Sequence, residues 1–215
     1  MPTEHFPLLG LRLRTPRLEL RLPSPEELGA LANTAAQGVH APGTIPFTVP
    51  WTDRPPADVA RGVVQHHWHT LGQWTPDDWQ LHLTVFHAGD VVGQQDVRAR
   101  DFAVLRQVNT GSWLGMRHHG KGIGTEMRAA VLHLAFTGLG ADEALSSAFA
   151  DSHASRAVSR KLGYQDNGTE RAVVQGAMTI EQRLRLTRAD WEKRATIPVT
   201  IEGLAPCLPM FGLPG

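Results

Sequence analysis

The spacing of hydrophobic residues in the first half of the chain predicts short strands and two helices. Within residues 11–22, leucines alternate with charged residues from Leu18 to Leu22, which is the period-2 pattern of a half-buried strand. Ser24 and Pro25 then provide an N-cap and a first-turn proline, so we expect a helix from there to about residue 35. Similar patterns further on predict a helix over 58–71, a hairpin of strands over 79–85 and 91–98, and a strand over 108–116.

The spacing becomes helical after residue 122. Apolar residues from Ile123 to Leu139 recur at intervals of three and four, and Gly138 and Gly140 mark the end of this helix. Alternating helices and strands predict a mixed α/β fold around one sheet. A buried strand is expected over 144–150, followed by a helix that Asp151 or Ser152 caps and Gly163 ends. Gly168 and Gly176 then mark turns, and a last strand is expected over 178–186. Arg183, Arg185 and Arg188 are expected on the solvent face of that strand.

Residues 36–58 form a long loop with five prolines and two aromatic residues, Phe47 and Trp51. Loops of this length inside a domain are usually functional. These two side chains either contact a substrate or only anchor the loop, and the sequence favours neither interpretation. Trp113, near the end of the strand over 108–116, is either a core residue or a wall of a binding site.

Composition narrows the class of protein. The chain has 21 Lys and Arg against 21 Asp and Glu, and this balance argues against a protein that binds long nucleic acids, which usually carries a basic excess. With 41% hydrophobic and 20% charged residues, it has the composition of an ordinary globular domain. No apolar stretch is long enough for a membrane span, no signal peptide is recognisable, and a single cysteine excludes an intrachain disulfide. We therefore expect a cytoplasmic protein of one domain with no membrane partner.

Histidine is abundant, yet the sequence predicts no metal site. His66 and His69 share a helix face, but no carboxylate or cysteine accompanies them at ligand spacing, so we expect them and His67 to form a solvated helix face. Cys207 lies in an apolar tail without a histidine beside it, which favours packing over catalysis.

The segment with the clearest chemistry joins the strand over 108–116 to the helix that starts at Ile123. Gly120, Gly122 and Gly124 allow the main chain to approach a ligand closely, and the first N–H groups of the helix point outward with the positive end of its dipole. Such an arrangement binds phosphate or pyrophosphate. A plain glycine-rich connection explains the loop equally well, because it has neither the Walker Gly-Lys-Ser/Thr ending nor the dinucleotide Gly-x-Gly-x-x-Gly spacing.

Four segments in order resemble the GNAT acyltransferase superfamily. His119–Gly124 resembles its signature Gln/Arg-x-x-Gly-x-Gly/Ala, which grips the pyrophosphate of an acyl-CoA, and Gly111–Gly115 resembles the strand before it. Asp151–Tyr164 resembles the downstream helix, and Leu13–Arg21 resembles the opening strand of the RimJ/RimL-like branch, the ribosomal-protein N-acetyltransferases.

The resemblance implies a fold and boundaries. We expect a single-domain GNAT fold over 11–190, of the α/β (α+β) class, with a mixed, strongly bent sheet and helices on both faces. A Pro- and Gly-rich apolar extension over 191–215 is expected to pack on the same domain. This tail resembles an extension found in an actinobacterial subset, some of whose members are similar to succinyl-CoA-dependent enzymes.

The resemblance also implies an acyl donor and its contacts. Acetyl-CoA is the expected donor, succinyl-CoA is the alternative, and no metal is implied. The donor is expected where the fourth and fifth strands splay, in contact with Leu114, Gly115, Met116, His119, Gly120, Lys121, Gly122, Ile123, Gly124 and Thr125, and with Ser152 and Ser155 of the downstream helix. Two of these residues depart from the family pattern, since His119 replaces Gln or Arg and Ser152 replaces Asn.

The implied reaction is direct attack by an amine on the thioester in a ternary complex. A backbone N–H around residues 114–116 is expected to stabilise the oxyanion. Ser159 replaces the Tyr that many members use as an acid, so Ser155 is the candidate donor to the leaving thiolate. Asp96 is the candidate base, and a solvated carboxylate at a strand end is at least as good an interpretation of it.

The acceptor is expected to be an amine on a small molecule, a protein N-terminus or a lysine, with Phe47, Trp51 and Trp113 as candidate contacts. A homodimer is one possibility, because the branch is often dimeric. Two other classes stay open. One is a catalytically silent module that binds acyl-CoA, which the departures at His119 and Ser152 favour, and the other is a ribosome- or nucleic-acid-associated factor, which the zero net charge opposes.

Overall fold

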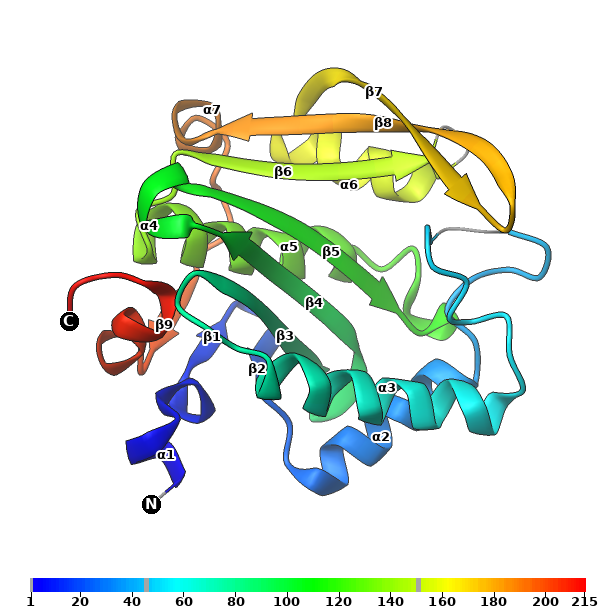
Figure 1. The fold of residues 1–215 in the computed structure, drawn as a ribbon, viewed down its shortest axis with the longest axis horizontal. Coiled ribbons are helices and arrows are strands. Elements are labelled where there is room, and N and C mark those ends of the chain that lie inside the picture. Colours follow the sequence, from blue (N-terminus) through cyan, green and yellow to red (C-terminus); the bar gives the residue numbers. More distant parts are fainter. Residues whose placement is uncertain (1, 45–46, 150–151) are drawn as a thin grey trace.

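A nine-stranded sheet forms the centre of the molecule (Figure 1). The structure, a computed structural model, describes residues 2–44, 47–149 and 152–215. The strands lie in the order β7-β8-β6-β5-β4-β3-β2-β1-β9, and among them only β5 and β6 are paired in parallel. The strand bounds are β1 Arg12–Arg14, β2 Leu18–Arg21, β3 Asp78–His87, β4 Asp90–Arg100, β5 Gln107–Leu114, β6 Glu143–Phe149, β7 Gln165–Val174, β8 Ala177–Thr187 and β9 Thr200–Glu202.

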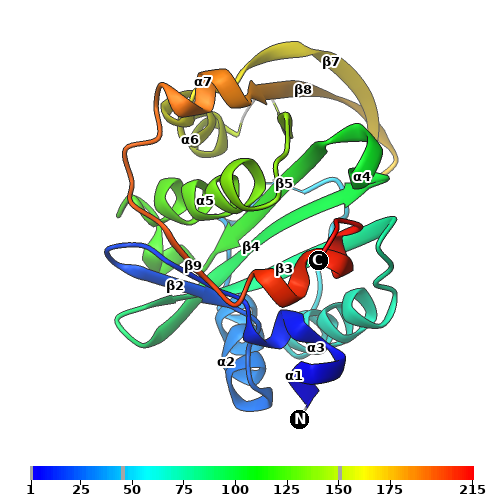
Figure 2. The same ribbon diagram turned by 90° about the vertical axis from the view of Figure 1, so that its left-hand side faces the viewer.

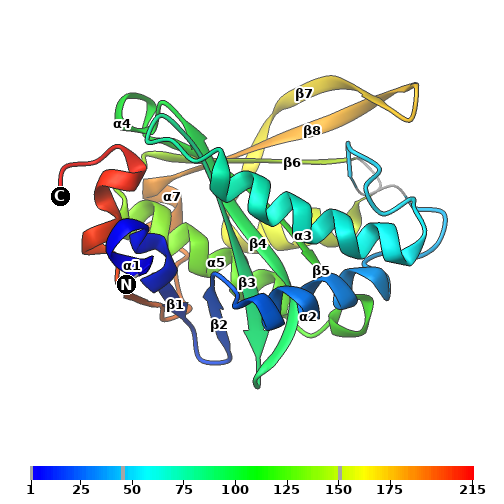
Figure 3. The ribbon, with the colours of Figure 1, turned by 60° about the horizontal axis from the view of Figure 1, so that its bottom comes forward.

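Helices cover both faces of this sheet, and the expected α/β fold with one mixed sheet is confirmed (Figures 2 and 3). The helices are α1 Pro2–His5, α2 Pro25–Ala36, α3 Pro56–Gly72, α4 Phe102–Leu105, α5 Ile123–His133, α6 His153–Leu162 and α7 Arg188–Glu192, and α5 continues into a π-helical turn, Leu134–Gly138. α5 and α6 lie on one face, and α2 and α3 lie on the other. Met127 and Val131 of α5 belong to the main core, whereas Leu31 of α2 and Val63 of α3 form a second cluster with Phe86.

Several local signals in the sequence act as expected. Ser24 caps α2 with a full capping box, because its hydroxyl accepts from the Glu27 N–H at 3.3 Å and Glu27 Oε2 accepts from the Ser24 N–H at 2.7 Å. Gly163 ends α6 with a φ of +96°, a left-handed conformation that glycine adopts without steric cost. Ser152 is the N-cap residue of α6, although its side chain makes no capping hydrogen bond, and Asp151 lies outside the described residues.

Three expected elements differ from the structure. Residues 11–22 form two short antiparallel strands, since Thr15 turns the chain by accepting the Leu18 N–H on its hydroxyl at 3.0 Å. Gly168 marks a shift in the register of β7 against β8, so it makes a bulge inside a strand. Arg188 is not on the solvent face of a strand, because it starts α7, which the Thr187 side chain caps, and its guanidinium donates to the carbonyl of Ala141 at 2.6 Å.

The C-terminal extension contacts the body of the domain. β9 extends the sheet by pairing with β1, and a 3₁₀ segment, Ala205–Phe211, follows it. Cys207 and Phe211 are fully buried there, and the Trp74 indole donates to the carbonyl of Met210 at 2.8 Å. Burial raises the pKa of the Cys207 thiol to about 11, which makes it a packing residue without nucleophilic character.

The parallel pair in the middle of the sheet opens along its length. β5 and β6 pair only at residues 107–109 and 143–145, and beyond this point the main chain of β6 pairs with β8 alone. The two strands therefore diverge toward the carboxyl end of β5, and α5 begins just beyond this opening (Figure 1). We call this opening the splay.

Candidate active site

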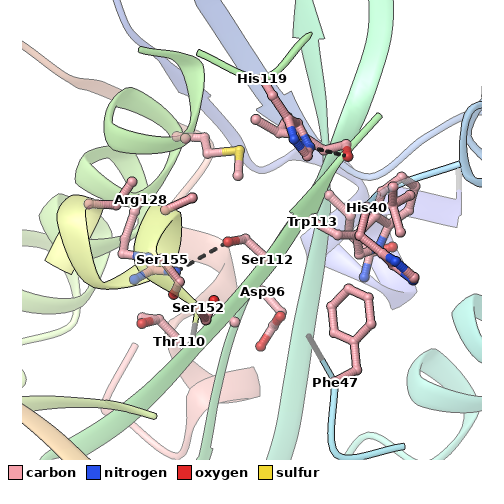
Figure 4. Close-up of a pocket in the computed structure, with 18 of the residues that line it drawn as sticks. His40, Phe47, Asp96, Thr110, Ser112, Trp113, His119, Arg128, Ser152 and Ser155 are labelled. Carbon is pink, nitrogen blue, oxygen red and sulfur yellow. Dashed lines mark hydrogen bonds between the residues drawn. The ribbon is translucent and has the colours of Figure 1, made fainter. Parts of the chain in front are cut away.

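A cavity of about 1160 Å³ lies at the splay and reaches both faces of the sheet. On one face, which we call the α5 side, it is lined by the loop and helix start over 118–128 except Lys121 and Glu126, by residues 146–148 of β6, and by residues of α6 and its N-cap between 152 and 161. On the other face, the α3 side, it is lined by residues among 39–44 and 47–66, together with His82 of β3 and Gln94, Asp96 and Arg98 of β4. Figure 4 shows β5 between the two, with Arg128 and Ser155 on its α5 side and Trp113, His40 and Phe47 beyond it on its α3 side.

The glycine-rich loop on the α5 side has the conformation that anion binding requires. Gly120 and Gly122 have φ angles of +73° and +77°, and Gly122 is the N-cap residue of α5. No side chain caps this helix, so its first N–H groups are left for a ligand. Gly120 and residues 122–125 line the cavity, as the expected contacts of a pyrophosphate should.

Arg17 braces this loop from the other end of the chain. Its guanidinium donates to the carbonyl of Lys121 at 3.1 Å and to Glu126 Oε2 at 2.7 Å. Glu126 is buried in the first turn of α5, where it also accepts from the Thr15 hydroxyl at 2.6 Å, and these bonds to Arg17 and Thr15 hold its pKa below its usual value. A Cβ on Gly122 would lie 3.4 Å from Arg17 Nη2. The turn at residues 15–17 is thereby fixed to the loop.

Three of the expected donor contacts do not line the cavity. Gly115 is buried under α2, since a Cβ there would lie 2.8 Å from Thr34 Cγ2. Met116 is exposed and its N–H donates to the carbonyl of Gly38. Lys121 is exposed as well, and its carbonyl is the group that Arg17 holds.

His119 and Leu114 shape the edge of the splay. His119 Nε2 lies 3.0 Å from the Leu114 carbonyl oxygen, to which it donates. The Gly115 N–H donates to the carbonyl of Val92 on β4, and main-chain groups of successive strand residues point to opposite edges. The Leu114 N–H therefore faces the splay, where a developing negative charge could accept from it.

A buried arginine on the α5 side is the main residue that the sequence reasoning missed. Arg128 of α5 is only 4% exposed and lines the cavity. It donates to Ser159 Oγ of α6 at 3.0 Å and to Ser112 Oγ of β5 at 3.3 Å, while its Nε has no hydrogen-bond partner. Burial lowers the pKa of Arg128, and within the described residues no carboxylate lies at ion-pair distance from it. The sequence did carry a signal for this residue, since Arg128 is a charged residue on the inward face of a helix that is otherwise apolar.

Ser152 and Ser155, the expected contacts in the downstream helix, line the cavity near Arg128. Ser159, next along α6, accepts from Arg128 and donates to the carbonyl of Ser155 at 3.1 Å. Ser155 is thus the hydroxyl of this helix that faces the cavity within one turn of a buried cation.

Asp96 on the α3 side lies in mid-strand, so it is not the solvated strand-end carboxylate that the sequence also allowed. It pairs with Gly111 of β5, and a Cβ on Gly111 would lie 2.6 Å from Asp96 Oδ1. The missing side chain of Gly111 makes room for the carboxylate. Burial raises the pKa of Asp96, and the charges of Arg98 and Arg128 and the N–H of Gly111 partly oppose this effect.

Two imidazoles stand beside Asp96. His82 is its cross-strand partner on β3, and the ring of His66 from α3 packs edge-on against His82 with 4.9 Å between centroids. Burial lowers the pKa of His82 to about 3, and it also lowers the pKa of His66, so both rings are neutral at pH 7. The expected solvated histidine face is thus only partly correct, because His66 lines the cavity and His67 is buried.

Aromatic rings form the opposite wall of the α3 side. Phe47 and Trp51 of the long loop pack together with 5.2 Å between ring centroids, and Trp51 continues to Trp113 at 5.7 Å. All three line the cavity, and their outer sides pack on the cluster formed by α2 and α3. These residues therefore both anchor the loop and line the site.

The described residues contain no group of three or more metal-ligating side chains that could hold an ion, and no helix among them is long and apolar enough to cross a membrane.

The chain belongs to the GNAT acetyltransferase family. A family model described as an acetyltransferase (GNAT) domain matches residues 17–165, which is more than half of the sequence. The protein is therefore a transferase of the N-acyltransferase type.

Solved structures of other acetyltransferases have the same fold. RimJ from Mycobacterium smegmatis, in complex with CoA-disulfide, is 20% identical with a TM-score of 0.64, covering 86% of this chain and 89% of its own. A GCN5-related N-acetyltransferase from Brucella melitensis is 16% identical with a TM-score of 0.65, covering 84% of this chain and 80% of its own. RimL, the ribosomal L7/L12 alpha-N-protein acetyltransferase in complex with coenzyme A, is 17% identical with a TM-score of 0.59, covering 80% of this chain and 95% of its own.

Proposed function

We propose that this protein transfers an acyl group from acyl-CoA to a primary amine by direct attack within a ternary complex. The observation that carries the proposal is the uncapped start of α5 beside Gly122, open to the same cavity as Asp96. Two structures of the same fold, RimJ and RimL, were solved with coenzyme A derivatives.

The residues of the α5 side fit the donor. Main-chain N–H groups at 122–124 would take the pyrophosphate, and a Cβ at Gly122 would disturb this contact. The strand edges left unpaired by the splay would bond to the pantetheine arm, with Ser152 and Ser155 alongside. The thioester then lies near Leu114 and Arg128.

The chemistry follows from these positions. The neutral amine attacks the thioester carbonyl, and the Leu114 N–H bonds to the oxygen as it gains charge. Asp96 accepts the proton that the amine nitrogen loses, and its raised pKa makes it a better base than an ordinary aspartate. The C–S bond breaks, and Ser155 donates a hydrogen bond to the departing thiolate.

Acetyl-CoA is the proposed donor, and one observation favours succinyl-CoA as a second candidate. Arg128 is a buried guanidinium with a free Nε–H and no ion-pair partner among the described residues. A carboxylate at the end of a succinyl group would neutralise it, whereas an acetyl group would leave it with Ser112 and Ser159 alone.

Thermal shifts and calorimetry with acetyl-CoA, succinyl-CoA and free CoA test these proposals. No shift with any of the three would refute the donor site. Tighter binding of succinyl-CoA that disappears in Arg128→Gln would select the second candidate. Binding without acyl transfer to any amine would instead favour a catalytically silent module.

The acceptor is proposed to be an amine on a small molecule or a protein. RimL is named for acetylating the α-amine of a protein, which makes a protein N-terminus one of the candidates here. A homodimer and a cytoplasmic location remain predictions, and light scattering would decide the first of them.

A further inference from the structure

Within the proposed function, the α3 side of the cavity points to one class of acceptor. We propose that the acceptor is an arylalkylamine, a primary amine two or three bonds from an aromatic ring, with its nitrogen at Asp96 and its ring against Trp113 and Trp51. The inference rests on the proposed acyl transfer and goes beyond it, because the family match leaves the acceptor open.

The first argument is the spacing of the carboxylate and the aromatic wall. Asp96 is opposite Gly111, and Trp113 is two residues further along the same strand, so both side chains lie on the α3 face. Such diagonal neighbours on adjacent strands are about 7–8 Å apart, which leaves room for a nitrogen at one and a ring at the other. A linear amine could reach Asp96 equally well but would leave the indole without a planar partner.

The second argument is the surface that the rings present. Phe47, Trp51 and Trp113 contact one another in series, and all three are partly buried against the second cluster. Each ring is therefore held in place before a ligand arrives, and offset or edge-on contacts with a ligand ring need little reordering.

The third argument is the charge around this wall. The facing imidazoles, His66 and His82, are kept neutral by burial. Arg54 and Arg98 also line the cavity, and the carboxylate of Asp58 is already paired with Arg61 at 2.9 Å. The site thus offers one carboxylate to one amine, and its arginines oppose a polyamine or a lysine-rich peptide.

The fourth argument is the cover over the α3 side. The Thr48 hydroxyl donates to Glu181 at 2.7 Å, and the Gln175 amide donates to Asp53 at 2.6 Å. These bonds connect the long loop to the hairpin of β7 and β8, which lies beside it in Figures 1 and 3. A cavity covered in this way suits a small molecule better than an extended peptide.

Initial rates with four acceptors test the proposal: 2-phenylethylamine, hexylamine, spermidine and a peptide that begins with serine. We expect kcat/KM for 2-phenylethylamine to exceed that for hexylamine about tenfold, since ring contacts add to the burial that both share. The substitution Trp51→Leu should lower kcat/KM for 2-phenylethylamine more than for hexylamine, and so remove this preference. Trp68→Leu is the matched control, because Trp68 lies on the outer face of α3 and is 63% exposed.

Equal or better turnover of hexylamine, spermidine or the peptide would overturn the inference while leaving the proposed acyl transfer intact. An equal loss for both amines in Trp51→Leu would overturn it too. If no amine is acylated, the proposed function fails. Calorimetry of 2-phenylethylamine with the CoA-loaded protein then still shows whether an arylalkylamine binds at the aromatic wall. Saturable binding that Trp51→Leu weakens supports that site, and absence of binding refutes it.

Discussion

The α5 side of the cavity presents mainly main chain, whereas the α3 side presents side chains. On the α5 side, two left-handed glycines and an uncapped helix start point N–H groups at the ligand. On the α3 side, Asp96, His82 and Trp113 come from three different strands, and Phe47 and Trp51 come from a loop. A phosphate site can be built by a few consecutive residues, but a site for a particular amine needs residues brought together by the sheet.

The two sides also differ in charge. The guanidinium of Arg128 lines the α5 side, while the imidazoles of His66 and His82 on the α3 side are neutral and the pKa of Asp96 is raised. A protein with zero net charge can therefore still present a positive site to an anion, because the charge is local and the helix start adds to it. The following substitutions separate the two sides, from the largest expected effect to the smallest.

Gly122→Val should weaken CoA binding by about 100-fold or more, since it removes the left-handed turn at the start of α5 and places a branched side chain near Arg17. Titration calorimetry with CoA measures the effect. Gly176→Val is the matched control, because Gly176 has a φ of +80° in the open turn between β7 and β8. Unchanged CoA affinity in the first variant would show that the pyrophosphate lies elsewhere.

Asp96→Asn should lower kcat by about 10²–10³-fold while leaving CoA affinity unchanged, since a neutral amide cannot accept the proton. The rate of the wild-type protein should rise with pH as Asp96 loses its proton. Because burial raises the pKa of Asp96, this rise should occur above the ordinary pKa of an aspartate, and it should be absent from the pH–rate profile of Asp96→Asn. Gly111→Ala should act similarly, because its Cβ would occupy the place of the carboxylate. Asp166→Asn on the exposed part of β7 serves as the control, and full activity in Asp96→Asn would exclude it as the base.

Arg17→Met should weaken CoA binding about tenfold and leave the affinity for the amine unchanged. The variant loses the bonds from Arg17 to Lys121 and Glu126, so the loop is less ordered before CoA binds. Arg100→Met, which breaks an exposed ion pair with Asp78, is the matched control. If both variants bind CoA equally, the brace has no part in donor binding.

Glu27→Gln should destabilise the fold by about 1–2 kcal/mol at pH 7 and alter neither side of the cavity. Hydrogen bonds from the Arg21 guanidinium and from the Ser24 N–H hold the pKa of Glu27 at about 2, below its ordinary 4.5. The contribution is therefore complete above about pH 4.5 and is lost as the pH falls toward 2. Urea unfolding of both proteins at pH 7 and pH 4 measures it, and a gap that widens at pH 4 would contradict this account.

Sequence patterns predicted the features that depend on neighbouring residues. Ser24 caps α2, Gly163 ends α6, and Gly120 and Gly122 form the loop before α5, as the sequence indicated. Each of these depends on backbone sterics or on hydrogen bonds within a few residues. The break between β1 and β2 was missed although it is local, and the sequence does carry its signal, since the leucines shift from odd to even positions across Thr15 and Pro16.

Contacts between distant residues were not predictable in this way. Arg17 and Glu126 are 109 positions apart, and Arg128 meets Ser159 across 31. Both Glu126 and Arg128 fall on the inward face of an apolar helix, which signals a buried charge without naming its partner. The sequence left open whether Asp96 is a base or a solvated carboxylate for the same reason, since only the pairing of β4 with β5 places Gly111 beside it.

By itself, the sequence determined the order of helices and strands, the glycine-rich helix start and the family. These features are set by local conformational preferences and by the period of the hydrophobic pattern. The tertiary structure alone decided that His82, Asp96 and Trp113 line one cavity, that Arg128 supplies a positive charge on its other side, and that Arg17 holds the glycine-rich loop. The physical reason is that burial and strand register set the pKa values and the shape of this cavity, and both arise only when segments far apart in the chain pack together.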